Sequence, residues 1–67
     1  MLNLNNKEQL KEMNKNSMLY TKGYIDSLKY KKHDFTQKEQ EFVDEFDILF
    51  KQTFSKEIDE VYKKMFN

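Results

Sequence analysis

The chain of 67 residues contains no cysteine, proline, tryptophan, arginine or alanine, and its one glycine is at position 23. Without cysteine it can form neither a disulfide nor a zinc site with thiolate ligands. His33 is the only histidine, which also excludes a metal site built from several histidines of one chain. Because proline is absent and glycine nearly so, few turns are obligatory, which favours long helices over a β-fold.

The length of the chain limits it to one domain, over residues 1–67. A chain this short buries only about 60% of the surface that its unfolded form exposes, so its core is small. Small domains usually compensate with disulfides, a bound metal or oligomerisation. Oligomerisation or partner binding is what the composition leaves open.

The first six residues have neither the basic start nor the apolar stretch of a secretory signal. No apolar run approaches the roughly 18 residues that a membrane span requires. We therefore expect a cytoplasmic protein with no membrane segment. The heavy use of Lys, Asn and Phe is typical of an AT-rich genome, such as that of a low-GC bacterium or its phage.

Apolar residues recur at helical spacing over two long segments, about 7–32 and 37–65. Asn5 or Asn6 can cap the first helix, and Gly23 falls on its solvent side. The core side of this helix is expected to hold Leu10, Met13, Ser17, Tyr20, Tyr24 and Leu28, with Met18, Thr21 and Ile25 beside them. A break near residues 16–17, giving two shorter helices, is an open alternative.

The segment His33-Asp34-Phe35-Thr36 separates the two helical patterns. Thr36 followed by Glu39 predicts a capping box, in which both side chains accept hydrogen bonds from unpaired backbone N–H groups. Two helices of similar length joined by so short a loop pack antiparallel. The sequence thus predicts an all-α fold, an antiparallel helical hairpin.

Charge is distributed unevenly along a chain whose net charge is zero. Residues 1–33 carry +4 and residues 34–62 carry −6. In a hairpin the lysines that end the first helix lie beside an acidic patch at Glu41, Asp44, Glu45 and Asp47. Pairing within the chain is the favoured interpretation, and a docking surface for a basic partner is the alternative.

An apolar stripe recurs every four residues along the second helix, at Phe42, Phe46, Phe50, Phe54, Ile58, Tyr62 and Phe66. Each step of four advances about 40° around a helix, so the stripe winds through roughly 240° and one neighbouring helix cannot cover all of it. A second chain can cover the rest in a four-helix bundle. Alternatively, the helix breaks near residues 53–55 and folds back over the hairpin, or the stripe stays exposed for a foreign partner.

No catalytic, cofactor or metal site is predicted. Ser17, Ser27 and Ser55 have only His33 as a conceivable base, and nothing in the sequence specifies that they are close to it. The Glu-x-x-His pair of di-iron bundles and the Asp-rich loop of an EF-hand are missing. Without arginine or a lysine-rich helix face, direct nucleic-acid binding is not expected.

Two short stretches carry family resemblances. Residues Ser55-Lys56-Glu57-Ile58-Asp59-Glu60-Val61 resemble the Ser-x-Glu-Leu-Asp-x-Leu signature of small helical aspartyl-phosphate phosphatases that act on sporulation response regulators. That resemblance implies functional roles for Asp59, Ser55 and Glu57. The stretch from Phe35-Thr36-Gln37-Lys38-Glu39 to Val61-Tyr62-Lys63-Lys64-Met65 is similar to the Hha/YmoA modulators, which implies binding to a nucleoid-associated protein.

The leading hypothesis is a small cytoplasmic interaction module, a regulator or inhibitor of phage or bacterial origin that binds a larger protein. Its predicted interface is the aromatic face at Phe46, Phe50, Phe54, Ile58, Tyr62 and Phe66. The alternatives are a structural homodimer that forms a four-helix bundle, and the phosphatase.

Overall fold

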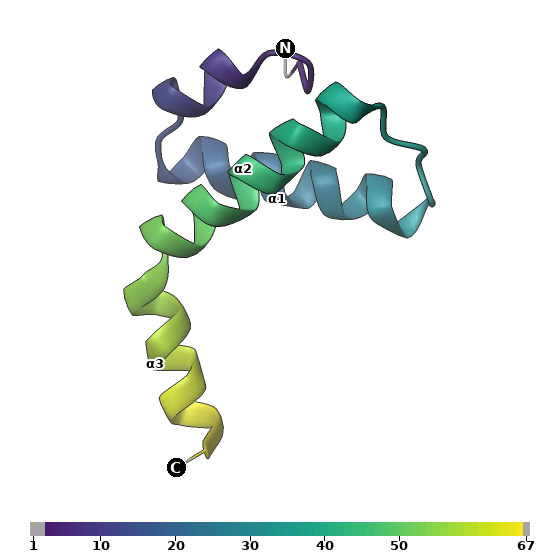
Figure 1. Cartoon of the computed structure of the whole chain (residues 1–67). Coiled ribbons are helices and arrows are strands. Elements are labelled where there is room, and N and C mark those ends of the chain that lie inside the picture. The colour runs from purple at the N-terminus through teal and green to yellow at the C-terminus, as the bar shows by residue number, and fades with distance from the viewer. Residues whose placement is uncertain (1–2, 67) are drawn as a thin grey trace.

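The computed structural model describes residues 3–66, which form an all-α fold without strands. A short 3₁₀ helix precedes three α-helices (Figure 1): η1 (Lys7–Glu12), α1 (Lys15–Tyr30), α2 (Gln37–Thr53) and α3 (Ser55–Phe66). None of these helices combines the length and the apolar character needed to cross a membrane. Each of the two helices expected from the sequence is thus divided in two.

The first division lies at Met13 and Asn14, so the prediction of one helix over 7–32 is wrong. The alternative of two shorter helices is confirmed, with the break a few residues before the expected 16–17. Asn14 has extended backbone angles, and its side chain accepts a hydrogen bond of 2.8 Å from the Ser17 N–H. An asparagine in this position satisfies an otherwise unpaired donor and so favours a new helix start. Asn6 caps η1 in the same manner, as expected.

The core side of α1 consists of Met18, Thr21 and Ile25, with Leu28 half-buried at its end. Tyr20 and Tyr24, expected on this side, are exposed. The physical reason is that α2 crosses α1 obliquely (Figure 1) and so covers a narrower strip than a parallel neighbour covers. The buried Thr21 hydroxyl donates a hydrogen bond of 2.8 Å to the Ser17 carbonyl, which satisfies it.

The loop between α1 and α2 is defined at both ends by hydrogen bonds. At the end of α1, Lys32 has a φ of 59°, and the His33 N–H donates to the Leu28 carbonyl at 2.9 Å, the pattern of a Schellman motif. At the start of α2 the predicted capping box is confirmed: Thr36 Oγ1 accepts from the Glu39 N–H, and Glu39 Oε1 accepts from the Thr36 N–H. This backbone donor lowers the pKa of Glu39.

The core lies where α2 crosses α1. Its most deeply buried side chains are Phe42, Phe46, Met18, Ile25 and Val43. Leu4 and Leu10, from the N-terminal segment, are also buried in it, and Phe35 packs against it from the loop. Each such side chain contributes about 1.5–3 kcal/mol on burial, so this cluster is the main source of stability.

The second division is at Phe54, within the segment 53–55 where a break was anticipated. Phe54 has a φ of −104° and a ψ of 21°, which turns the chain between α2 and α3. The expectation that the last segment folds back over the other helices is wrong. Instead, α3 points away from them (Figure 1).

Replacing Thr36 with alanine is expected to lower the free energy of unfolding by about 1 kcal/mol, because the Glu39 N–H then loses its acceptor. Urea denaturation followed by circular dichroism measures this. Ser27→Ala is the matched control, an exposed hydroxyl within α1 whose removal we expect to be neutral or slightly stabilising. Equal losses in both variants would contradict the role of the cap.

Gly23→Ala is expected to raise the free energy of unfolding by about 0.5–1 kcal/mol, since alanine restricts the unfolded chain and favours the helix. Gly23 lies within α1, and a Cβ added there meets no atom within 4 Å. The same denaturation experiment measures the gain. A loss of stability would show that this side of α1 is covered.

Candidate protein-interaction surface

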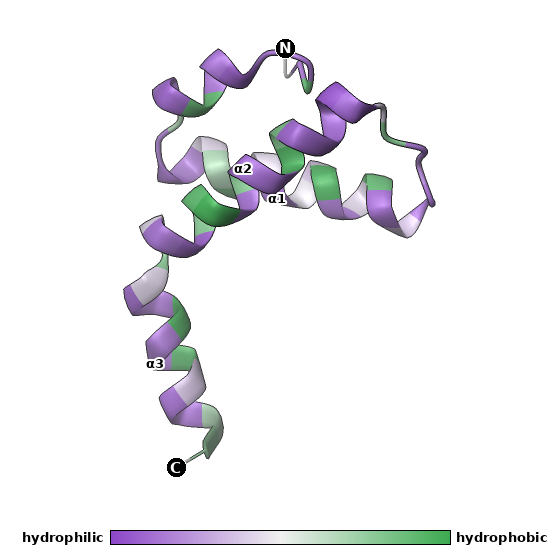
Figure 2. Ribbon diagram, in the orientation of Figure 1, coloured by the Kyte–Doolittle hydropathy of each residue, from purple (hydrophilic) through white to green (hydrophobic). Residues whose placement is uncertain are grey.

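All twelve residues of α3 are exposed, although one side of the helix is apolar. We call this side the α3 face; its members are Ile58, Val61, Tyr62, Met65 and Phe66. Figure 2 shows green, apolar positions gathered along one side of α3, with hydrophilic positions on the other. A soluble helix normally buries such a side against a neighbour. Here the described chain supplies no neighbour beyond the end of α2.

An open hollow of about 410 Å³ runs from the end of α2 along this face. Its walls are almost wholly apolar and consist of Phe50, Phe54, Ile58, Val61, Tyr62 and Met65, with Glu57 at the rim. The turn at Phe54 produces the hollow, because it sets α3 at an angle to α2. The apolar sides of both helices line the hollow. A groove of this composition suits an apolar side chain of another helix.

The start of α3 is held by aromatic and ionic contacts. The Phe54 ring stacks on Phe50 at 4.6 Å between centroids, and the Lys15 ammonium lies 5.5 Å from the Phe54 centroid. Lys15 also donates a hydrogen bond of 2.9 Å to Glu57 Oε1, which lowers the pKa of Glu57. These contacts fix the first turn of α3 relative to α1, and the later turns extend beyond them.

The predicted stripe is divided between core and surface. Phe46 is fully buried and belongs to the core, not to an accessible interface, and Phe54 is also buried. Phe50 is half-buried and lines the hollow. Ile58, Tyr62 and Phe66 are exposed together on α3, where the Tyr62 and Phe66 rings are tilted by 34° and their centroids are 5.2 Å apart. This is the part of the predicted interface that remains on the surface.

Val61 and Met65 also belong to the α3 face, although the predicted interface omitted them. They lie between the members of the stripe, and a strict step of four passes over them. Alternating steps of four and three connect Phe54, Ile58, Val61 and Met65, and that heptad spacing was the available signal.

The predicted acidic patch is largely paired within the chain. Lys7 Nζ lies 3.7 Å from Glu41 and 3.6 Å from Glu45, and Lys29 Nζ lies 3.8 Å from Asp47. The Asp44 carboxylate accepts a hydrogen bond of 2.9 Å from the Gln40 side chain. Lys7 thus links η1 to α2. Pairing within the chain is present, as the preferred interpretation holds, but Glu41 and Glu45 pair with Lys7 of η1, and of the lysines that end α1 it is Lys29 that reaches the patch. The patch is not favoured as a docking surface.

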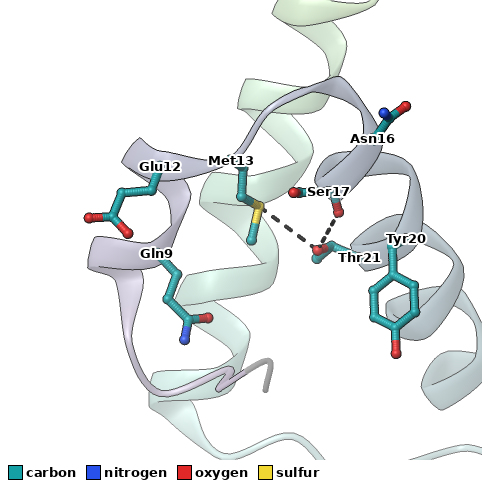
Figure 3. A pocket seen from close by; sticks show the side chains of 7 residues that line it. All are labelled: Gln9, Glu12, Met13, Asn16, Ser17, Tyr20 and Thr21. Carbon is teal, nitrogen blue, oxygen red and sulfur yellow. Dashed lines mark hydrogen bonds between the residues drawn. The ribbon is translucent and has the colours of Figure 1, made fainter.

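A second hollow, of about 650 Å³, lies between η1 and α1 (Figure 3). All but one of its lining residues are of polar types: Gln9, Glu12, Met13, Asn16, Ser17, Tyr20 and Thr21. The Thr21 hydroxyl is close to Met13 Sδ at 3.8 Å and is already bonded to Ser17. The hollow brings together no pair of groups suited to acid–base or nucleophilic chemistry among the residues that line it.

The positions implied by the phosphatase resemblance lie on α3, but they do not share one side. Ser55 and Asp59, four residues apart, lie on the side of α3 that carries Tyr62 and Phe66, whereas Glu57, bonded to Lys15, lies about 160° around the helix from both. His33 is in the loop, 3.6 Å from Glu39. Between residues 3 and 66, no three acidic or histidine side chains are grouped closely enough to hold a metal ion.

Comparison with protein-family models, with curated proteins and with solved structures finds no match to this chain.

Replacing a buried and an exposed phenylalanine of the stripe with alanine is expected to change the free energy of unfolding by very different amounts. Phe46→Ala removes a fully buried ring, and we expect a loss of about 3–5 kcal/mol, enough to unfold a domain of this size. Phe66→Ala removes a ring that is 73% exposed, and stability should change by less than about 0.5 kcal/mol. Thermal denaturation of both variants measures this, and similar losses would contradict the division.

Proposed function

We propose that this protein is an interaction module, a small regulator or inhibitor that acts by docking the α3 face onto a larger protein. In this proposal α1, the loop and α2 form a hairpin that serves as a scaffold. The hairpin carries the core, and α3 carries the contact surface. A cytoplasmic location fits a module of this kind.

The observation that carries the proposal is the exposure of five large apolar side chains on one side of a single helix. Val61, Tyr62, Met65 and Phe66 each expose more than half of their surface. Contiguous apolar patches bordered by charged residues are characteristic of protein contact sites. Tyrosine, phenylalanine and methionine are also enriched where partners meet.

Helix-in-groove recognition is the mode that this geometry supports. The α3 residues at alternating steps of four and three present a continuous apolar ridge, the anchor pattern of helices that bind a hydrophobic groove. Glu57 and Lys64 border one edge, and Asp59 borders the other. Such charges orient the helix in the groove and contribute more to specificity than to affinity.

A second candidate is the structural homodimer, in which the hairpins of two copies form a four-helix bundle. It is favoured by the same exposed face and by the small core of the chain. It differs from the first candidate in one respect: the second copy would be a permanent part of the fold and no foreign partner would be needed.

The experiment is affinity capture from the cells that encode the protein, with the wild-type chain and Ile58→Lys as baits. Ile58 lines the hollow, so a lysine there should reduce capture of a specific partner at least tenfold. Partners are identified by mass spectrometry and then tested as purified proteins.

Ile48→Lys is the matched control. Ile48 is an exposed isoleucine on α2, outside the α3 face, and the substitution changes charge and volume in the same way. Capture should survive it. A partner held equally by wild type and Ile58→Lys would show that the contact surface lies elsewhere.

A further inference from the structure

We propose that, without a foreign partner, the α3 face is covered by the α3 face of a second copy, with the two helices antiparallel. This inference rests on the proposed function, because it assigns an occupant to the same surface. It differs from the four-helix bundle, since only α3 and the hollow at its base form the contact. Binding of a partner would then compete with self-association.

The apolar residues match one another in an antiparallel register. Phe54, Ile58, Val61 and Met65 follow the heptad spacing in which one helix packs side chains between those of another. Antiparallel pairing about a two-fold axis near residues 59–60 sets Ile58 opposite Val61 of the second copy. It also sets Met65 of the second copy at the part of the hollow that Phe50 and Phe54 line.

The charged residues along one edge of this ridge support the same register. Glu57 and Lys64 lie at one edge of the ridge, seven residues apart. In an antiparallel pair the same edges of both helices meet, so Glu57 of each copy faces Lys64 of the other. Lys15 holds Glu57 Oε1, which leaves Oε2 to accept from the second lysine. Pairing Glu57 with Lys64 requires a two-fold axis between residues 60 and 61. This position is one residue from the axis, between residues 59 and 60, that the apolar pairs require.

A parallel arrangement lacks this complementarity. It would place Glu57 beside Tyr62 of the second copy and would form no charged pair along this edge. It would also set Met65 against Met65 and leave the hollow at Phe50 empty. Symmetric pairing of identical surfaces is the commonest way in which soluble chains dimerise.

The test is sedimentation equilibrium of the full chain and of charge variants at about 10 to 500 μM, a range suited to the weak affinity expected of so small an interface. Lys64→Glu should weaken the dimer about tenfold, because two attractive pairs per dimer become repulsive. Lys63→Glu is the control, with the same charge change on the polar side of α3. The double variant Glu57→Lys, Lys64→Glu should restore association.

Circular dichroism of each variant verifies that the helices are intact. A dimer insensitive to Lys64→Glu, or one weakened equally by Lys63→Glu, would overturn the antiparallel register. A chain that remains monomeric at the highest concentration would overturn self-pairing altogether. That result leaves the proposed function standing, because capture of a foreign partner lost in Ile58→Lys tests the surface independently of self-association.

Discussion

The structure depends on the burial of Phe42 and Phe46 where α2 crosses α1. Both rings are fully enclosed, together with Met18, Ile25 and Val43, and no disulfide or proline assists them. A chain of this length has few other apolar contacts to spare. The N-terminal segment therefore contributes as well, since Leu4 and Leu10 close the core and Lys7 reaches the carboxylates of α2.

The position of α3 follows from this concentration of the core. Once Phe42, Phe46 and Phe54 are buried, the chain turns at Phe54, and the remaining residues of the stripe lie on α3, which points away from α1. A helix of twelve residues without buried side chains is marginal in water. Its first turn is held by the Phe50–Phe54 stack and by the Lys15–Glu57 bond, and docking would stabilise the rest. In the proposed function, folding and binding would therefore use different parts of one stripe.

Local chemistry made several features predictable. The capping box at Thr36 and Glu39 follows from three residues of sequence, because its hydrogen bonds are formed within one turn. The Asn6 cap and the solvent side of Gly23 are equally local. The cap at Asn14 used the same chemistry but was missed, since uninterrupted helical periodicity outweighed a single asparagine.

The sequence by itself determined an all-α chain, the start of α2, and a stripe too wound for one neighbour to cover. Only the tertiary structure decided where the stripe leaves the core, and thus that Phe46 is enclosed while Ile58, Tyr62 and Phe66 are exposed. Periodicity gives the direction of each side chain around its own helix. The crossing of α1 and α2, and the turn at Phe54, depend on how distant side chains pack, which no local pattern encodes.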